Sequence, residues 1–99
     1  MEQDYTIKHF EVMTSIATRL AGMSALILEH RYSYETFGSW GFRFRKSGRE
    51  YEVVYEGRDW DLSLMDPADG SRCIGSRSLH KATADMIVHE TCSLIAEKT

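Results

Sequence analysis

The chain has few cysteines and prolines, the residues that constrain small domains with little hydrophobic core. It contains only two cysteines and one proline among 99 residues. Two cysteines cannot build the disulfide framework of a small secreted domain, and residues 1–4 lack the basic start of a secretory signal. We therefore expect a protein of the reducing cytoplasm. In it, Cys73 and Cys92 would be small buried hydrophobic residues, with a strand-to-helix disulfide as the alternative.

Long apolar runs and a strong charge of one sign are also missing. No uninterrupted apolar stretch approaches the roughly 18 residues of a membrane span, which predicts a soluble protein. The formal net charge is −3, from 12 Lys and Arg against 15 Asp and Glu. This acidic balance disfavours a protein whose main task is to grip phosphate backbones. With 42% hydrophobic and 11% aromatic residues, the chain can build one core, hence one domain over residues 1–99.

Residues 40–56 have the pattern of a β-hairpin. Aromatic residues alternate with Gly and Arg before a turn at residues 46–49, and Tyr and Val alternate with Glu after it. Closing this turn aligns both faces at once, because one register pairs aromatic with apolar residues and arginines with glutamates. The expected pairs are Phe44–Tyr51, Phe42–Val53, Trp40–Tyr55, Arg45–Glu50 and Arg43–Glu52.

Further alternation extends the sheet. A two-residue turn at residues 57–58 predicts a third strand paired with the second. A loop at residues 66–71, with Gly70 free to adopt a positive φ, precedes a strand at about 72–78 in which either Cys73 or Ile74 faces the core. Residues 31–37 predict one more strand, with a bulge at Gly38. The expected inward residues are Tyr32, Tyr34, Trp60, Leu62 and Leu64, with the pairs Tyr55–Trp60, Val53–Leu62 and Tyr51–Leu64.

Helical periodicity marks both ends of the chain. It predicts a helix over about residues 4–29, capped by Asp4 or Thr6, and a second over about 79–97, capped by Ser78. Two amphipathic helices can cover the single apolar face of a sheet over about 31–78. We therefore expect a two-layer α+β sandwich: an antiparallel meander of four or five strands between an N-terminal and a C-terminal helix. The first helix would place one apolar stripe on the sheet: Phe10, Met13, Ile16, Ala17, Leu20, Met23, Ser24 and Ile27.

The length of the first predicted helix suggests an assembly. A helix over residues 4–29 would run roughly 39 Å, whereas strands of about six residues span about 20 Å. Unless the helix breaks near Gly22, part of its apolar stripe overhangs the sheet and needs a cover. A second copy of the chain is the simplest cover, so we expect a homodimer formed through this helix.

The charged face of the sheet is the candidate surface for a partner. We expect a small non-enzymatic module that binds another protein, of unknown identity, in an inhibitor or immunity-type role. The possible partner-binding residues are Arg43, Arg45, Glu52, Glu56 and Asp61.

No catalytic, metal or cofactor motif rises above background. Glu56, Asp59 and Asp61 lie at an exposed turn without a cleft to perturb them. The spacing of Asp85, His89 and Cys92 could hold a transition metal, but His89 points to solvent on the predicted helix. His9 falls on the apolar stripe as a core-edge histidine, and His30 and His80 have no fixed partner. We therefore expect no metal and no cofactor, and a small enzyme ranks last among the alternatives.

The order helix, antiparallel meander, helix is similar to that of double-stranded-RNA-binding domains, whose final helix starts with a lysine cluster near phosphates. The resemblance covers about a dozen residues around 75–82, and the Gly-Pro-x-His loop of the family is missing. It implies an alternative function, a nucleic-acid-binding module. The residues that would contact phosphates are Arg77, His80 and Lys81, though two small basic ends separated by acidic residues make a poor phosphate track.

Overall fold

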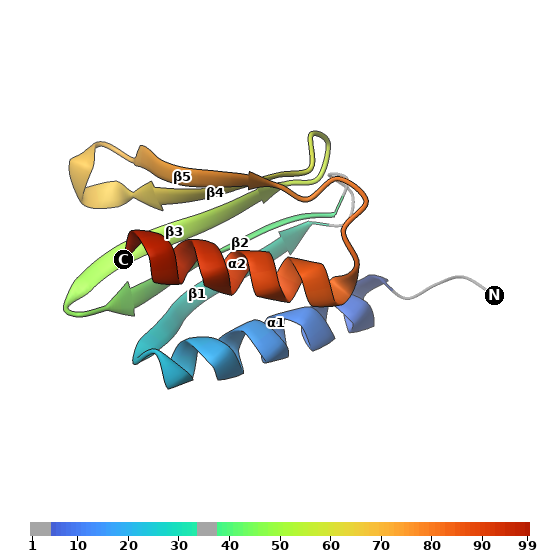
Figure 1. Ribbon diagram of the computed structural model, residues 1–99, viewed down its shortest axis with the longest axis horizontal. Coiled ribbons are helices and arrows are strands. Elements are labelled where there is room, and N and C mark those ends of the chain that lie inside the picture. Colours follow the sequence, from blue (N-terminus) through green and yellow to red (C-terminus); the bar gives the residue numbers. More distant parts are fainter. Residues whose placement is uncertain (1–4, 34–37) are drawn as a thin grey trace.

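The computed structural model describes residues 5–33 and 38–99. Two helices flank a continuous run of five strands (Figure 1). In chain order the elements are α1 (Tyr5–Gly22), β1 (Ala25–Ser33), β2 (Ser39–Lys46), β3 (Arg49–Glu56), β4 (Asp61–Asp66), the 3-10 turn η1 (Pro67–Asp69), β5 (Arg72–Ser78) and α2 (Ala84–Lys98). The predicted order is confirmed, with five strands instead of the open choice of four or five.

The strands form one open antiparallel sheet in the order β1-β2-β3-β4-β5. Both helices lie side by side on one face of this sheet (Figure 1), with α1 against β1 and α2 against β4 and β5. The molecule is therefore the predicted two-layer α+β sandwich. The core fills the space between the layers, and its largest fully buried side chains include Phe42, Phe44, Ile16, Leu20, Leu62, Leu64, Leu94 and Ile95.

The β2–β3 hairpin has the predicted register. All five predicted pairs are register partners across the two strands. Ser47 and Gly48 both have positive φ, 54° and 77°, as a two-residue hairpin turn requires when its twist matches the strands. Alternation on both arms was sufficient here because a slip by one residue would have put arginines in the core.

The predicted first helix is wrong beyond Gly22, and the predicted start of the sheet at about 31 is wrong with it. The Met23 and Ser24 N–H groups donate to carbonyls of the last helical turn, and Ser24 has a φ of 59°, which reverses the chain. Residues 25–33 then pair with β2 along its whole length. The short apolar run 25–28 fits helical and strand periodicity equally, and pairing with β2 decides for the strand.

The shorter helix removes the predicted overhang. The 18 residues of α1 rise about 27 Å, close to the roughly 30 Å of the nine-residue β1. The mismatch of lengths that suggested a homodimer therefore does not exist.

The predicted register of the third strand is shifted by two residues. Tyr55 pairs with Leu62 and Val53 with Leu64, because residues 57–60 form a four-residue turn in place of the predicted two-residue one. A shift of two preserves the inward face, so the core prediction survives. Trp60, however, precedes β4 and is 45% exposed, with its carbonyl accepting from the Leu79 N–H at 2.7 Å.

The second helix begins five residues later than predicted. Thr83 is its N-cap and accepts from the Met86 N–H at 3.2 Å, so the predicted Ser78 cap is wrong. The connection cannot be helical because the Leu79 N–H is bonded to Trp60 and Lys81 has a φ of 59°.

The structure also decides several details of β1, β5 and the loops. Ile74 packs against the core while Cys73 is exposed; both cysteines are free, and only Cys92 is buried as expected. The irregularity in β1 falls between Ile27 and Glu29, and Tyr32 faces inward as predicted. The predicted bulge at Gly38 adjoins residues 34–37, and those residues, Tyr34 included, lie outside the described part. Gly70 has the expected positive φ, 63°.

Across residues 5–33 and 38–99, neither helix has the length and apolar character needed to cross a membrane.

Candidate functional site

The face of the sheet opposite the helices, here called the outer face, is not covered by any element of residues 5–33 and 38–99 (Figure 1). Its side chains alternate along each strand with those of the core. All five residues predicted as partner-binding lie on this face: Arg43, Arg45, Glu52, Glu56 and Asp61.

A network of ion pairs crosses the first three strands of the outer face. Arg43 binds Glu50, and its second nitrogen lies 3.2 Å from Glu29. Arg45 reaches the same Glu50 at 3.3 Å. Hydrogen bonds from Arg43 and then Arg45 lower the pKa of the Glu50 carboxyl, and those to Glu50 and Glu29 raise the pKa of Arg43. Arg43 and Glu50 each have two ion-pair partners, and Arg45 and Glu29 have one each.

The predicted Arg43–Glu52 contact is correct in backbone register but wrong as an ion pair. Glu52 binds Arg31 of β1 at 2.9 Å, two strands away. Arg31 spans β2 where Gly41 has no side chain. A Cβ at Gly41 would lie 3.1 Å from Arg31 Nη2 and 2.8 Å from the Val53 carbonyl oxygen. The missing side chain therefore permits the bridge, and Arg43 turns to its register partner Glu29 on β1 and to Glu50, its diagonal neighbour on β3.

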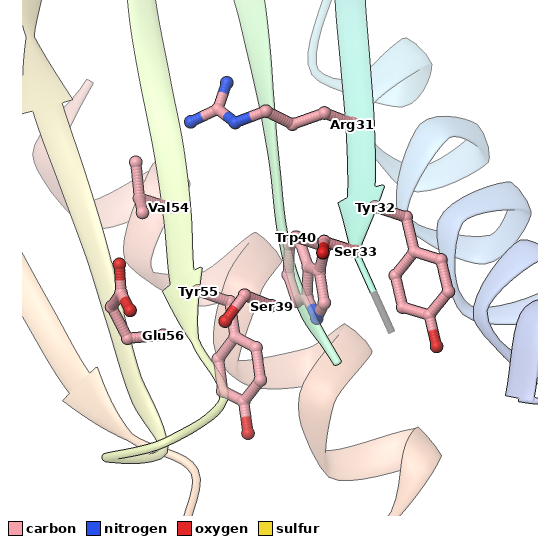
Figure 2. A pocket seen from close by; sticks show the side chains of 8 residues that line it. All are labelled: Arg31, Tyr32, Ser33, Ser39, Trp40, Val54, Tyr55 and Glu56. Atoms are coloured by element: carbon pink, nitrogen blue, oxygen red, sulfur yellow. The ribbon is translucent and has the colours of Figure 1, made fainter. Parts of the chain in front are cut away.

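A hollow of about 200 Å³ lies at one end of the outer face. Figure 2 shows it across β1, β2 and β3, where the outward residues of β2 are the small Ser39 and Gly41. Val54 and Glu56 come from β3, whereas Arg31 comes from β1 and extends its guanidinium across β2 towards the Val54 side, away from Ser39 (Figure 2). The residues of this outer-face hollow are Arg31, Tyr32, Ser33, Ser39, Trp40, Val54, Tyr55 and Glu56.

A hydrogen bond and a ring contact connect the residues at the floor of the hollow. Ser39 Oγ accepts from the Gly57 N–H at 2.9 Å, which ties β2 to the turn after β3. The rings of Trp40 and Tyr55 stack with centroids 5.4 Å apart, so each covers a face of the other. Burial raises the pKa of the Tyr55 hydroxyl.

The outer face is acidic at the end that holds the hollow. The outward side chains of its strands include three arginines and five carboxylates, a net formal charge of −2: Arg31, Arg43, Arg45, Glu29, Glu50, Glu52, Glu56 and Asp61. All three arginines are engaged by glutamates of the same face. Glu56 and Asp61, which are register partners across β3 and β4, are exposed and make no ion pair within residues 5–33 and 38–99. The uncompensated charge is therefore at this end.

A histidine pair lies on the opposite, helix-facing side of the sheet. His9 of α1 is only 7% exposed, and its Nε2 is 2.7 Å from Nε2 of His30 on β1. The His9 ring also stacks on Tyr32 at 4.1 Å. Burial, and then His30, lowers the pKa of His9 to about 4; burial, and then Arg31, lowers that of His30. The core-edge position of His9 is as predicted, but its partner was missed because the predicted helix runs to about residue 29 and leaves His30 outside the sheet.

The residues of the nucleic-acid alternative do not form one basic surface. Arg77 pairs with inward-facing Leu62, so it lies on the helix side, where it binds Glu97 at 2.7 Å and Glu90 at 3.6 Å. The His80 ring lies 4.4 Å from the Trp60 ring. Lys81 remains as an exposed cation, which is little for a phosphate contact surface.

The three residues of α2 with metal-ligand spacing do not point to one place. Cys92 is buried while Asp85 and His89 are exposed, and burial raises the pKa of the Cys92 thiol. Within the described part of the chain no three His, Cys, Asp or Glu side chains gather as metal ligands would.

Comparison with known proteins gives no further guide. No protein family model, curated protein or solved structure matches this chain. The interpretation of the outer face therefore rests on its geometry and charge.

Proposed function

We propose that this protein is a small binding module that captures another protein on the outer face of its sheet. The observation that carries the proposal is a sheet face that no other described element covers, on which three arginines are joined by ion pairs to Glu29, Glu50 and Glu52. Preorganised side chains lose little entropy when a partner binds. Such a module can serve as an inhibitor or immunity-type protein.

The size of the outer face suits a modest interface. Five strands of six to nine residues, about 4.8 Å apart, present roughly 600 Å² in flat projection. The relief of the side chains raises this area towards the roughly 800 Å² per partner of a standard interface. Because the net charge of the face is −2, we infer a partner surface with an excess of basic side chains.

A capture experiment tests the proposal. The immobilised protein is exposed to nuclease-treated and untreated extract of its source, and a captured protein is then purified and titrated by calorimetry. The double variant Arg43→Ala with Glu52→Ala should lose binding. The matched control Lys8→Ala with Glu11→Ala removes one charge of each sign from the exposed side of α1 and should bind like the wild type. Retained binding by the outer-face variant, or capture that disappears with nuclease, would refute the proposal.

A homodimer through α1 stays a second, separate proposal. The observation that favours it is Phe10, which is 58% exposed on α1. Light scattering at micromolar concentration should then give twice the monomer mass of 11.4 kDa, and Phe10→Asp should restore the monomer. A monomeric wild type would exclude this dimer.

A further inference from the structure

We propose that the outer-face hollow is the anchor site for one cationic side chain, a lysine or an arginine, of the protein bound to the outer face. This inference rests on the proposed function, since it identifies the group that the partner inserts. It commits to a single long side chain with a positively charged end.

The volume of the hollow fits one side chain. At about 200 Å³ it lies below the roughly 300 to 1,000 Å³ of sites for drug-sized ligands. It would hold about six or seven water molecules at roughly 30 Å³ each. An inserted side chain can displace that water without needing a larger opening.

The walls of the hollow match the two parts of such a side chain. Val54 is the apolar residue among the outward side chains that line it, and it offers a surface for a methylene stem (Figure 2). Glu56 stands beside it at the exposed end, with no ion pair among the described residues. A stem along Val54 therefore brings an ammonium or guanidinium group towards an uncompensated carboxylate.

The positive charge of the arginine that lines the hollow is already paired with a carboxylate. The Arg31 guanidinium is held by Glu52 at 2.9 Å and points away from Ser39 (Figure 2). An anionic occupant would instead meet Glu56 and, across the register pair, Asp61. Trp40 and Tyr55 stack on each other and face the helix side of the sheet, so the carboxylate on the outer face supplies the recognition.

A small probe tests the anchor site without the partner. N-acetyl-lysine methylamide has 14 non-hydrogen atoms, and an ordinary ligand efficiency gives a Kd of about 1 mM. Titration followed by amide chemical shifts should perturb residues 31–33, 39–41 and 54–56. N-acetyl-norleucine methylamide has a similar stem without the ammonium group and should bind at least about fivefold more weakly. The arginine and citrulline analogues repeat the comparison for a guanidinium.

Matched variants assign the effect to Glu56. Glu56→Gln keeps the size of an exposed side chain and should weaken the lysine probe about fivefold. Asp85→Asn removes a carboxylate from the exposed side of α2 and should leave the affinity for the lysine probe unchanged. No shift at roughly 20 mM probe, equal binding of norleucine, or unchanged binding by the folded Glu56→Gln variant would each overturn the anchor site.

The two proposals fail in different ways. If the probe does not bind but partner capture still depends on Arg43 and Glu52, the anchor site is wrong and the binding face stands. If the probe binds as expected but capture ignores those two residues, the hollow recognises cations while the partner uses another surface.

Discussion

His9 lies where a positive charge is unfavourable, and this gives a prediction at the scale of one residue. Its pKa is about 4 in the fold against 6.5 in the unfolded chain. Above about pH 6.5 neither state binds the proton, whereas between about 6.5 and 4 only the unfolded chain does. Stability should therefore fall as the pH decreases through this window, by about 1 to 2 kcal/mol at pH 5 after allowance for solvent screening.

Urea unfolding midpoints between pH 7 and pH 5 measure this effect. His9→Gln keeps a hydrogen-bonding side chain beside His30 and should flatten the pH dependence, although His30, whose pKa is also lowered, retains part of it. His89→Gln changes an exposed histidine on α2 and serves as the control. A pH dependence that is equally steep in the wild type and in His9→Gln would show that the pair is not its source.

Gly41 gives a second prediction at this scale, because its missing side chain shapes the binding face. In Gly41→Ala the Cβ would meet the Val53 carbonyl oxygen at 2.8 Å, and backbone cannot move aside cheaply. We expect a loss of about 1 to 3 kcal/mol and release of Arg31 from Glu52. Gly22→Ala is the matched control: nothing lies within 4 Å of its Cβ, and removing a helical glycine should gain up to about 1 kcal/mol. Urea denaturation of both variants decides, and equal stabilities would contradict the close approach.

At the scale of elements, sequence patterns succeeded where two independent signals agreed. The β2–β3 hairpin was predictable because its apolar and charged faces require the same register. The end of α1 was not, because the apolar run at residues 25–28 fits a helix as well as a strand until pairing with β2 decides. The register of β4 failed for a related reason: a shift by two residues leaves every side chain on the same face, so the pattern cannot detect it.

The candidate site shows the same division between pattern and geometry. Alternation placed Arg43, Glu52 and Glu56 on one face, and the structure confirms that placement. The bridge from Arg31 over Gly41 was not predictable, because it depends on the register of β1 with β2 and on where a long side chain points. The hollow was not predictable either, because its walls also depend on the register of β1 with β2 and on the direction of the Arg31 side chain.

The corrected start of α2 yields a prediction for this element. Thr83→Ala removes the side-chain oxygen that accepts from the Met86 N–H and should cost about 1 kcal/mol. Ser78→Ala should cost less, because Ser78 Oγ makes only a 3.4 Å contact with the His80 N–H outside the helix. Thermal unfolding of the two variants compares the caps directly. A larger loss in Ser78→Ala would place the start of the helix where the sequence pattern had put it.

At the scale of the whole molecule, the sheet separates stability from binding. Its inner side holds residues with no exposed surface, such as Phe42 and Val53, whereas the outer charges remain in contact with solvent. Removing an exposed ion pair changes stability little, because water solvates the separated charges almost as well. Removing a buried ring leaves a cavity that the packed layers cannot fill. Side chains on the outer face can therefore be changed without loss of the packing on the inner face.

Because the two faces are separate in this way, variants of each should behave differently. Phe42→Ala should cost about 3 to 5 kcal/mol, a large part of the stability of a domain of this size. Arg43→Ala with Glu52→Ala should lower the melting temperature by only a few degrees while abolishing partner binding. Calorimetric melting of both variants beside the capture assay tests the two sides together. If the outer-face variant unfolded as readily as Phe42→Ala, the ion-pair network would be part of what holds the sheet together, and loss of capture could no longer be attributed to the binding face.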